Sequence, residues 1–152
     1  MRTPTKSIIR RATGSDAGVV TELLIELDCD IELAGVERRL ARLADSPSDR
    51  VFVAEVNGAV VGLLGIHLAP LLHRDSFARI TAFIVTEKHR GTGLGAALLR
   101  EAEAWALARG CRQIEVTSGD HHATSHGFYE RHGYRLDDRR FVKEEFPSAE
   151  AR

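Results

Sequence analysis

The feature that most constrains the fold is a strand, a glycine-rich turn and a long helix that follow one another between Phe77 and Gly110. Residues 77–85 are rich in apolar, β-branched and aromatic side chains and contain no breaker, which predicts a strand. From Leu94 to Ala108, apolar residues recur at steps of three and four, which predicts a helix with one buried stripe. Gly110 is typical of the residue that ends such a helix. The rest of the chain is organised around this unit.

The turn between this strand and this helix has the chemistry of an anion-binding site. Residues 90–95 read Arg-Gly-Thr-Gly-Leu-Gly, so that free backbone N–H groups and the positive end of the helix dipole converge there. Glycines at alternate positions let a ligand approach the backbone, and Arg90 adds a fork of donors suited to phosphate oxygens. The alternative is an ordinary turn with a structural arginine. We interpret the turn as a site for a phosphate or, better, a pyrophosphate.

Two classes of ligand compete for this turn. Read as Gly91-x-Gly93-x-x-Ala96, it matches the dinucleotide fingerprint, and Glu115 follows at about the expected distance of 20 residues. That fingerprint should open a series of strand–helix–strand units, whereas here two helices and several strands come first. Glu115 also falls inside a strand pattern, and too little chain follows Gly95 for a doubly wound domain. The context therefore disfavours a dinucleotide.

Read as Arg90-x-x-Gly93-x-Gly95 after Val85, the turn resembles the acyl-CoA motif of the GCN5-related N-acetyltransferase (GNAT) superfamily. Residues 126–134, His-Gly-Phe-Tyr-Glu-Arg-His-Gly-Tyr, look like the second signature of that family. The order and spacing of elements fit as well, and the resemblance covers nearly the whole chain. Within the family, the chain looks most like small-amine acetyltransferases such as the aminoalkylphosphonate N-acetyltransferases.

The resemblance implies acetyl-CoA as cosubstrate and a set of cofactor contacts. In the family, the strand before the turn holds the pantetheine arm through backbone hydrogen bonds, and the turn amides hold the pyrophosphate. A backbone N–H of the same strand would polarise the thioester carbonyl. In this chain the implied contacts are Phe83, Ile84, Val85, Arg90, Gly91, Thr92, Gly93, Leu94, Gly95, Ser125 and Phe128.

The implied reaction is direct attack of a small primary amine on the thioester in a ternary complex. The resemblance places Tyr129 where it protonates the departing thiolate, because a phenol with a pKa near 10 is protonated at neutral pH. The alternative role for Tyr129 is packing on the buried face of a helix. Two alternative functions remain open: a non-catalytic acyl-CoA-binding module and, with less support, a dinucleotide-binding protein.

The general base is open at this stage. Many relatives carry an acidic residue three positions before the valine that precedes the turn, and this chain has Ala82 there. Proton removal then falls to water, to a carboxylate from elsewhere or to a histidine, because an unperturbed imidazole is partly neutral at pH 7. The candidates are His67, His73, His121 and His122.

For several other polar and charged side chains, the sequence gives weaker support for a function. His122 and His126 have metal-ligand spacing on a helix, but the chain offers no third ligand, so no metal is expected. The acidic connection 28–32 is either a solvated loop or a surface that attracts a cationic amine. Arg74 and Arg79 are either solvated or paired with a phosphonate or carboxylate of the acceptor.

Length and composition favour a single domain over residues 1–152, with flexible tails expected at 1–7 and 147–152. The resemblance implies that this is an N-acetyltransferase domain. The resemblance implies an α/β (α+β) fold class: a mixed, mostly antiparallel, splayed sheet of six or seven strands with helices on both faces. Strands are expected at 8–13, 50–56, 59–68, 77–85, 112–117 and 140–146, and the last helix at 123–132. The net charge of −1 argues against nucleic acid as a partner, and no apolar run is long enough to span a membrane.

Two further expectations concern the setting of the protein. Cys29 and Cys111 form no CxxC pair, so both are expected to be reduced and structural, in keeping with a cytoplasmic protein. The resemblance also implies a possible homodimer, because the family often dimerises.

Overall fold

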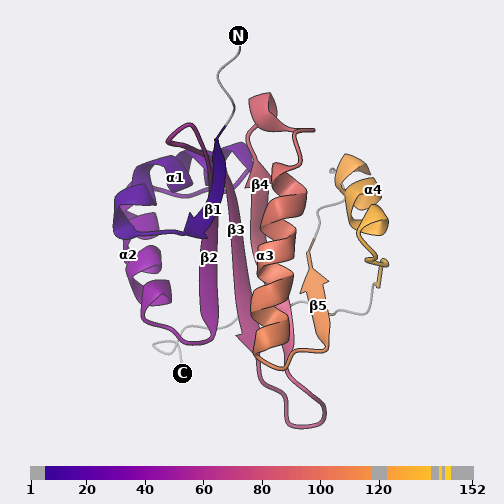
Figure 1. Ribbon diagram of the computed structural model, residues 1–152. Helices are drawn as coiled ribbons and strands as arrows, with labels where there is room; N and C mark the ends of the chain where they lie inside the picture. The colour runs from indigo at the N-terminus through magenta and orange to yellow at the C-terminus, as the bar shows by residue number, and fades with distance from the viewer. Residues whose placement is uncertain (1–5, 118–122, 138–140, 142, 145–152) are drawn as a thin grey trace. The chain divides into compact units, whose positions relative to one another are not determined.

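The computed structural model describes residues 6–117, 123–137, 141 and 143–144. The chain divides into two compact parts, Met1–Thr117 and Ser118–Arg152, and each is described by itself. The elements of the first part are β1 (Ser7–Arg11), the 3-10 turn η1 (Gly14–Asp16), α1 (Ala17–Glu26), α2 (Leu33–Ala44), β2 (Asp49–Val56), β3 (Ala59–Ala69), β4 (Phe77–Val85), the 3-10 turn η2 (Glu87–His89), α3 (Leu94–Ala108) and β5 (Gln113–Val116). In the second part the structure describes α4 (Ala123–Arg131). Figure 1 shows these elements in chain order.

The five strands described form one sheet in the order β1-β2-β3-β4-β5. Neighbours are antiparallel as far as β4, and β5 runs parallel to β4. The mixed, mostly antiparallel sheet predicted from the sequence is therefore confirmed. The count of six or seven strands is not, because the strand expected at 140–146 lies mainly outside the described residues.

The hairpin between β2 and β3 turns at Asn57 and Gly58, a residue pair typical of tight hairpin turns. Their φ angles are 50° and 85°, and two consecutive positive values are the mark of a type I′ turn. This turn sets the register, in which Val56 pairs with Ala59 and Phe52 with Leu64.

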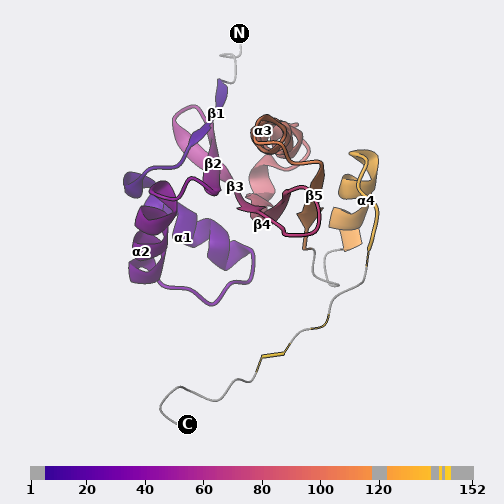
Figure 2. The same ribbon diagram turned by 90° about the horizontal axis from the view of Figure 1, so that it is seen from below.

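Helices cover both faces of the sheet in the first part of the chain, as predicted. In Figure 2, α1 and α2 lie on one side of the strands and α3 on the other. The α1 and α2 side is filled by one apolar cluster: Ala17, Val20, Leu23, Val36, Leu40, Val53, Leu63 and Ile84. The α3 side is sealed by side chains that are fully buried, among them Leu64, Leu98, Leu99, Ala102 and Ala106.

Gly62 of β3 allows α3 to pack close to the sheet. A Cβ atom there would lie 3.1 Å from Cδ1 of Leu98 and 3.2 Å from Cβ of Ala54. Gly65, three residues on, faces the opposite side of the sheet, and its Cβ would lie 3.1 Å from Oγ1 of Thr81. Beside Gly65 the pairing of β3 with β4 also shifts register, which marks an irregularity in the sheet at this point.

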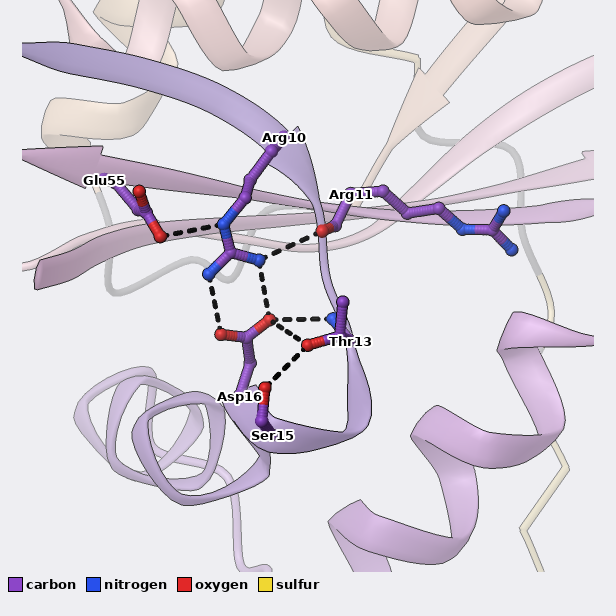
Figure 3. A network of polar contacts seen from close by, with 6 residues as sticks. All are labelled: Arg10, Arg11, Thr13, Ser15, Asp16 and Glu55. Atoms are coloured by element: carbon purple, nitrogen blue, oxygen red, sulfur yellow. Dashed lines mark hydrogen bonds and ion pairs between the residues drawn. The ribbon is translucent and has the colours of Figure 1, made fainter. Parts of the chain in front are cut away.

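A polar network ties β1 to the beginning of α1 (Figure 3). Arg10 donates to both carboxylate oxygens of Asp16 at 2.8 Å and to Oε1 of Glu55 at 2.8 Å. The backbone N–H of Thr13 also donates to Asp16, at 2.7 Å. Asp16 is buried, so these contacts replace the water that its carboxylate gives up on folding.

Candidate active site

The glycine turn that begins α3 has a backbone that favours glycine. Gly91 and Gly93 have φ angles of 75° and 89°, in the left-handed region that side chains other than glycine rarely adopt. Gly93 is the N-cap of α3, which starts at Leu94. A Cβ atom at either glycine would meet nothing within 4 Å, so space lies open over this stretch of backbone.

The same turn presents unpaired backbone donors. Ala97 is the first residue of α3 whose N–H reaches a carbonyl of the chain, that of Gly93, at 3.1 Å. Within the described part of the chain, the N–H groups of residues 94–96 have no backbone acceptor. With the positive end of the helix dipole, these donors can hold an anion such as a diphosphate.

Arg90 precedes the turn and is anchored to two neighbouring elements. Its Nε donates to the carbonyl of Val85 at 2.9 Å, and its Nη2 donates to Oε2 of Glu26, the last residue of α1, at 3.1 Å. The other oxygen of Glu26 accepts from the hydroxyl of Thr86 at 2.7 Å. Sequence reasoning missed Glu26, because this contact spans 64 residues and no local pattern marks it.

The edge of β4 that faces β5 is only partly used. Pairing with β5 runs from Phe77 opposite Gln113 to Ile80 opposite Val116 and stops there. Along residues 81–85, no described strand pairs with β4 on that side. This segment contains Phe83, Ile84 and Val85, which the resemblance implies as cofactor contacts. The short 3-10 turn η2 then connects it to the glycine turn. An extended ligand can add to such an edge through main-chain hydrogen bonds.

A row of four polar side chains crosses the α1 and α2 side of the sheet. Asp49 pairs in register with His67, His67 with Arg79, and Arg79 with Glu115, so the row runs over β2, β3, β4 and β5. Asp49 is four residues before Val53 on β2, so its side chain points to the same side of the sheet as Val53, which belongs to the apolar cluster. The row therefore lies on the α1 and α2 side. Nδ1 of His67 lies 2.8 Å from Oδ1 of Asp49, and Nη2 of Arg79 lies 3.0 Å from Oε2 of Glu115.

The remaining base and acceptor candidates are less well placed or are not described. His73 is exposed in the loop before β4. Arg74 donates to the side-chain oxygen of Gln113 at 2.7 Å, and with Arg79 it lies over the ring of Phe77. Arg74 is thus engaged within the chain, whereas Arg79 belongs to the polar row and keeps a side chain 41% exposed. His121 and His122, and with them the proposed His122–His126 spacing, fall outside the described residues.

Tyr129 lies on α4, in the second part of the chain. Its ring contacts Phe128 edge-on, with centroids 5.5 Å apart, and Tyr134 at 5.9 Å. Burial raises the pKa of Tyr129 to about 12, so its phenol is a persistent proton donor. The α4 helix ends at Arg131, and Gly133 follows with a φ of 88°, so that the N–H of Tyr134 returns to the carbonyl of Tyr129. Ser125, also on α4, is half-buried.

Among the described residues, no three His, Cys, Asp or Glu side chains gather as a metal site would require. None of the helices described has the length and apolar character to cross a bilayer. Cys29 is exposed and Cys111 buried, and both are free thiols.

Comparison with known proteins gives consistent results. Residues 21–134 match the model of the acetyltransferase (GNAT) family. The chain is 29% identical over 137 residues to the aminoalkylphosphonate N-acetyltransferase of Salmonella typhimurium, a match that covers 89% of both chains. It is 31% identical over 132 residues to the glucosamine 6-phosphate N-acetyltransferase of Trypanosoma brucei brucei, covering 82% of this chain and 86% of that one.

Solved structures share the fold at low sequence identity. An aminoglycoside N-acetyltransferase in complex with CoA has a TM-score of 0.85 at 13% identity, covering 95% of this chain and 98% of that one. The glucosamine-6-phosphate N-acetyltransferase from Arabidopsis thaliana has a TM-score of 0.80 at 18% identity, covering 91% and 98%.

Proposed function

The chain belongs to the acetyltransferase (GNAT) family, and on that premise we propose that it transfers an acetyl group from acetyl-CoA to a primary amine of a small molecule. The amine attacks the thioester directly, with both substrates bound at once. The observation that carries the proposal is the turn before α3, where two left-handed glycines and the free N–H groups of residues 94–96 surround open space.

The cofactor would lie along this turn and along β4. The diphosphate of acetyl-CoA binds the amides of the turn, which need no side chain and are already oriented by the helix. The pantetheine arm adds to the edge of β4 along residues 81–85, beyond Ile80, the last residue that pairs with β5. Because β5 occupies the edge from Ile80 back to Phe77, the thioester would come to rest near Thr81. There a strand N–H can polarise its carbonyl.

Tyr129 is the proposed acid of the reaction. As the amine adds and the carbon–sulfur bond breaks, the phenol donates its proton to the departing thiolate. Its half-buried, protonated phenol supports this role, because a donor with a pKa of about 12 does not ionise at neutral pH.

The acceptor is proposed to carry an acidic phosphorus group as well as the amine. The two relatives are named for an aminoalkylphosphonate and for glucosamine 6-phosphate, and both names describe amines with a phosphonate or phosphate group. In this chain, Arg79 is the cation at the centre of the polar row, with a side chain 41% exposed. Arginine suits phosphonate and phosphate oxygens through its planar fork of donors.

A turnover assay tests the proposal. Release of free CoA from acetyl-CoA is followed with aminoethylphosphonate, glucosamine 6-phosphate and an aminoglycoside as acceptors, and the acetylated product is identified by mass. We expect turnover with at least one phosphorus-containing amine. Binding of CoA without turnover on any amine would support a non-catalytic acyl-CoA module, and thermal stabilisation by NADH but not by CoA would support the dinucleotide alternative.

A further inference from the structure

We propose that His67, held in place by Asp49, is the general base that takes the proton from the acceptor amine. This inference rests on the proposed function and deepens it, because the family's usual carboxylate position is occupied here by Ala82. The observation behind it is a carboxylate–imidazole pair on the face of the sheet that carries Thr81, near which the thioester would lie.

The position of His67 follows from strand register. Gly65 pairs with Ala82, and the missing Cβ of Gly65 leaves room for the hydroxyl of Thr81 on the α1 and α2 side of the sheet. His67 is two residues beyond Gly65 on β3, so its side chain points to the same side about 7 Å along the strand. An imidazole at that distance reaches an amine over Thr81 directly or through one water.

The contacts of His67 set up its ring as a base. Asp49 accepts from Nδ1–H at 2.8 Å, and its second oxygen accepts from the hydroxyl of Ser46 at 2.7 Å. These two hydrogen bonds fix the orientation of the Asp49 carboxylate, and the Asp49 side chain is only 16% exposed. With the proton on Nδ1, the lone pair of Nε2 is free to accept another proton. The side chain of His67 is 46% exposed, which leaves it accessible to a substrate.

The neighbouring charged groups support this assignment. Arg79 lies on β4 and pairs in register with His67 on β3, but its guanidinium forms an ion pair with Glu115. Glu115 is in turn held by Arg79 and Gln113, so it is poorly placed to act as the base itself. Among the described histidines, His67 has its Nδ1 on a carboxylate, whereas His132 directs Nδ1 to the backbone carbonyl of Phe128.

The proton and electron balance of the step is simple. Nε2 of His67 takes one proton from the ammonium, and the freed nitrogen lone pair forms the new bond to the thioester carbon. The carbon–sulfur bond breaks, and the thiolate takes a proton from Tyr129. The nitrogen loses its second proton as the amide forms, and that proton passes through water to the Tyr129 oxygen and restores the phenol. The imidazolium then returns its proton to water, which leaves a neutral imidazole for the next turnover.

The test uses the full chain, acetyl-CoA and aminoethylphosphonate, or whichever amine of the panel the unchanged protein acetylates. His67→Gln should lower kcat about a hundredfold and leave the KM for acetyl-CoA within twofold. His67→Ala should lose as much, and added imidazole should restore part of the rate, which a purely structural role would not allow. His73→Gln is the matched control and should keep full activity.

Asp49→Asn provides a second variant, since Asp49 is a positioning residue. We expect kcat to fall about tenfold with no rescue by imidazole, because His67 is still present. Circular dichroism and thermal stabilisation by CoA establish that each variant is folded.

The outcomes separate this inference from the proposed function. If the unchanged protein acetylates no amine, the proposed function fails and the inference fails with it. If it is active and His67→Gln keeps kcat within threefold, only the inference is overturned. A loss that imidazole does not restore in His67→Ala also overturns it, because the side chain then serves packing or substrate binding.

Discussion

Arg10 binds both carboxylate oxygens of Asp16, each at 2.8 Å, and so fastens the first strand to the beginning of α1 (Figure 3). The side chain of Asp16 is only 7% exposed. The hydrogen bonds from Arg10 hold the pKa of that carboxyl at about 2, below its usual 3.8. This pair therefore contributes to stability in a way that depends on pH.

Asp16→Asn should lower the free energy of unfolding by about 2–3 kcal/mol at pH 7, because it leaves the Arg10 guanidinium without its buried partner. Urea denaturation measures the change. Asp75→Asn is the matched control, since its ion pair with Arg112 at 3.2 Å is exposed on both sides and should be worth less than about 0.5 kcal/mol. Equal losses in the two variants would contradict the role given to Asp16.

The same pair predicts acid sensitivity. A carboxyl whose pKa is lower in the folded state stabilises above its unfolded pKa, and this contribution is lost as pH falls through the folded pKa. For Asp16 the window runs from about pH 4 to about pH 2, and the loss amounts to about 2 kcal/mol. Urea denaturation across this range should show the difference between the unchanged protein and Asp16→Asn shrinking. A constant difference would place the acid-sensitive group elsewhere.

Gly62 and Gly18 should respond to alanine in opposite directions. Gly62→Ala places a methyl group 3.1 Å from Leu98 and 3.2 Å from Ala54, and we expect it to cost about 1–3 kcal/mol as α3 is pushed from the sheet. Gly18 lies in α1 with nothing within 4 Å, so Gly18→Ala should gain about 0.5–1 kcal/mol from helix propensity. Thermal or urea unfolding of the two variants measures the change in the free energy of unfolding. A change of the same sign in both variants would contradict the packing argument.

Local signals in the sequence predicted most of the fold. The strand at 77–85 and the helix at 94–108 have the predicted bounds, because β-branched content, helical spacing and a terminal glycine are all local. The turn at Asn57 and Gly58 is a local feature too, because an Asn-Gly pair readily adopts two consecutive positive φ angles. The predicted strand at 140–146 is not tested by the described residues.

The candidate site was less predictable, because its key contacts join residues far apart in the chain. His67 was one of four histidines that the sequence could not rank, and what distinguishes it is Asp49, 18 residues earlier on the paired strand. That pairing depends on the register of the hairpin. Glu26 and Arg90 meet only when α1 packs over the end of β4, and a solvated acidic residue at a helix end looks the same in the sequence.

Gly93→Ala should weaken CoA binding at least tenfold. The left-handed φ of 89° strains any residue with a Cβ, so the backbone shifts and the free N–H groups of the turn lose their alignment. Gly110→Ala is the matched control, because Gly110 follows the other end of α3 and also has a left-handed φ, of 80°. We expect each of the two substitutions to lower the free energy of unfolding by about 1–2 kcal/mol, but Gly110→Ala should leave the Kd for CoA unchanged. Calorimetric titration with CoA measures both. An unchanged Kd in Gly93→Ala would remove the turn from the cofactor site.

Glu26→Gln should tighten CoA binding about threefold to fivefold. The Glu26 carboxylate holds Nη2 of Arg90 at 3.1 Å, so a diphosphate at the turn has to compete for that donor and also meets a negative charge nearby. Glu22→Gln, an exposed change of the same charge on α1, controls for net charge and should leave the Kd unaltered. Weaker binding by Glu26→Gln would mean instead that the carboxylate orders the turn through Thr86.

Tyr129→Phe should lower kcat about a hundredfold and leave the Kd for CoA within twofold, because it removes a proton donor and keeps the ring. Burial favours the neutral phenol and raises its pKa to about 12, so the proton is retained as pH rises and lost only in strong alkali. The kcat of the unchanged protein should therefore show no decline due to Tyr129 below about pH 10. Tyr134→Phe, which alters the aromatic neighbour 5.9 Å away, should keep most of the activity. An alkaline decline below pH 10 that disappears in Tyr129→Phe would contradict the raised pKa, and full activity in that variant would remove Tyr129 from the reaction.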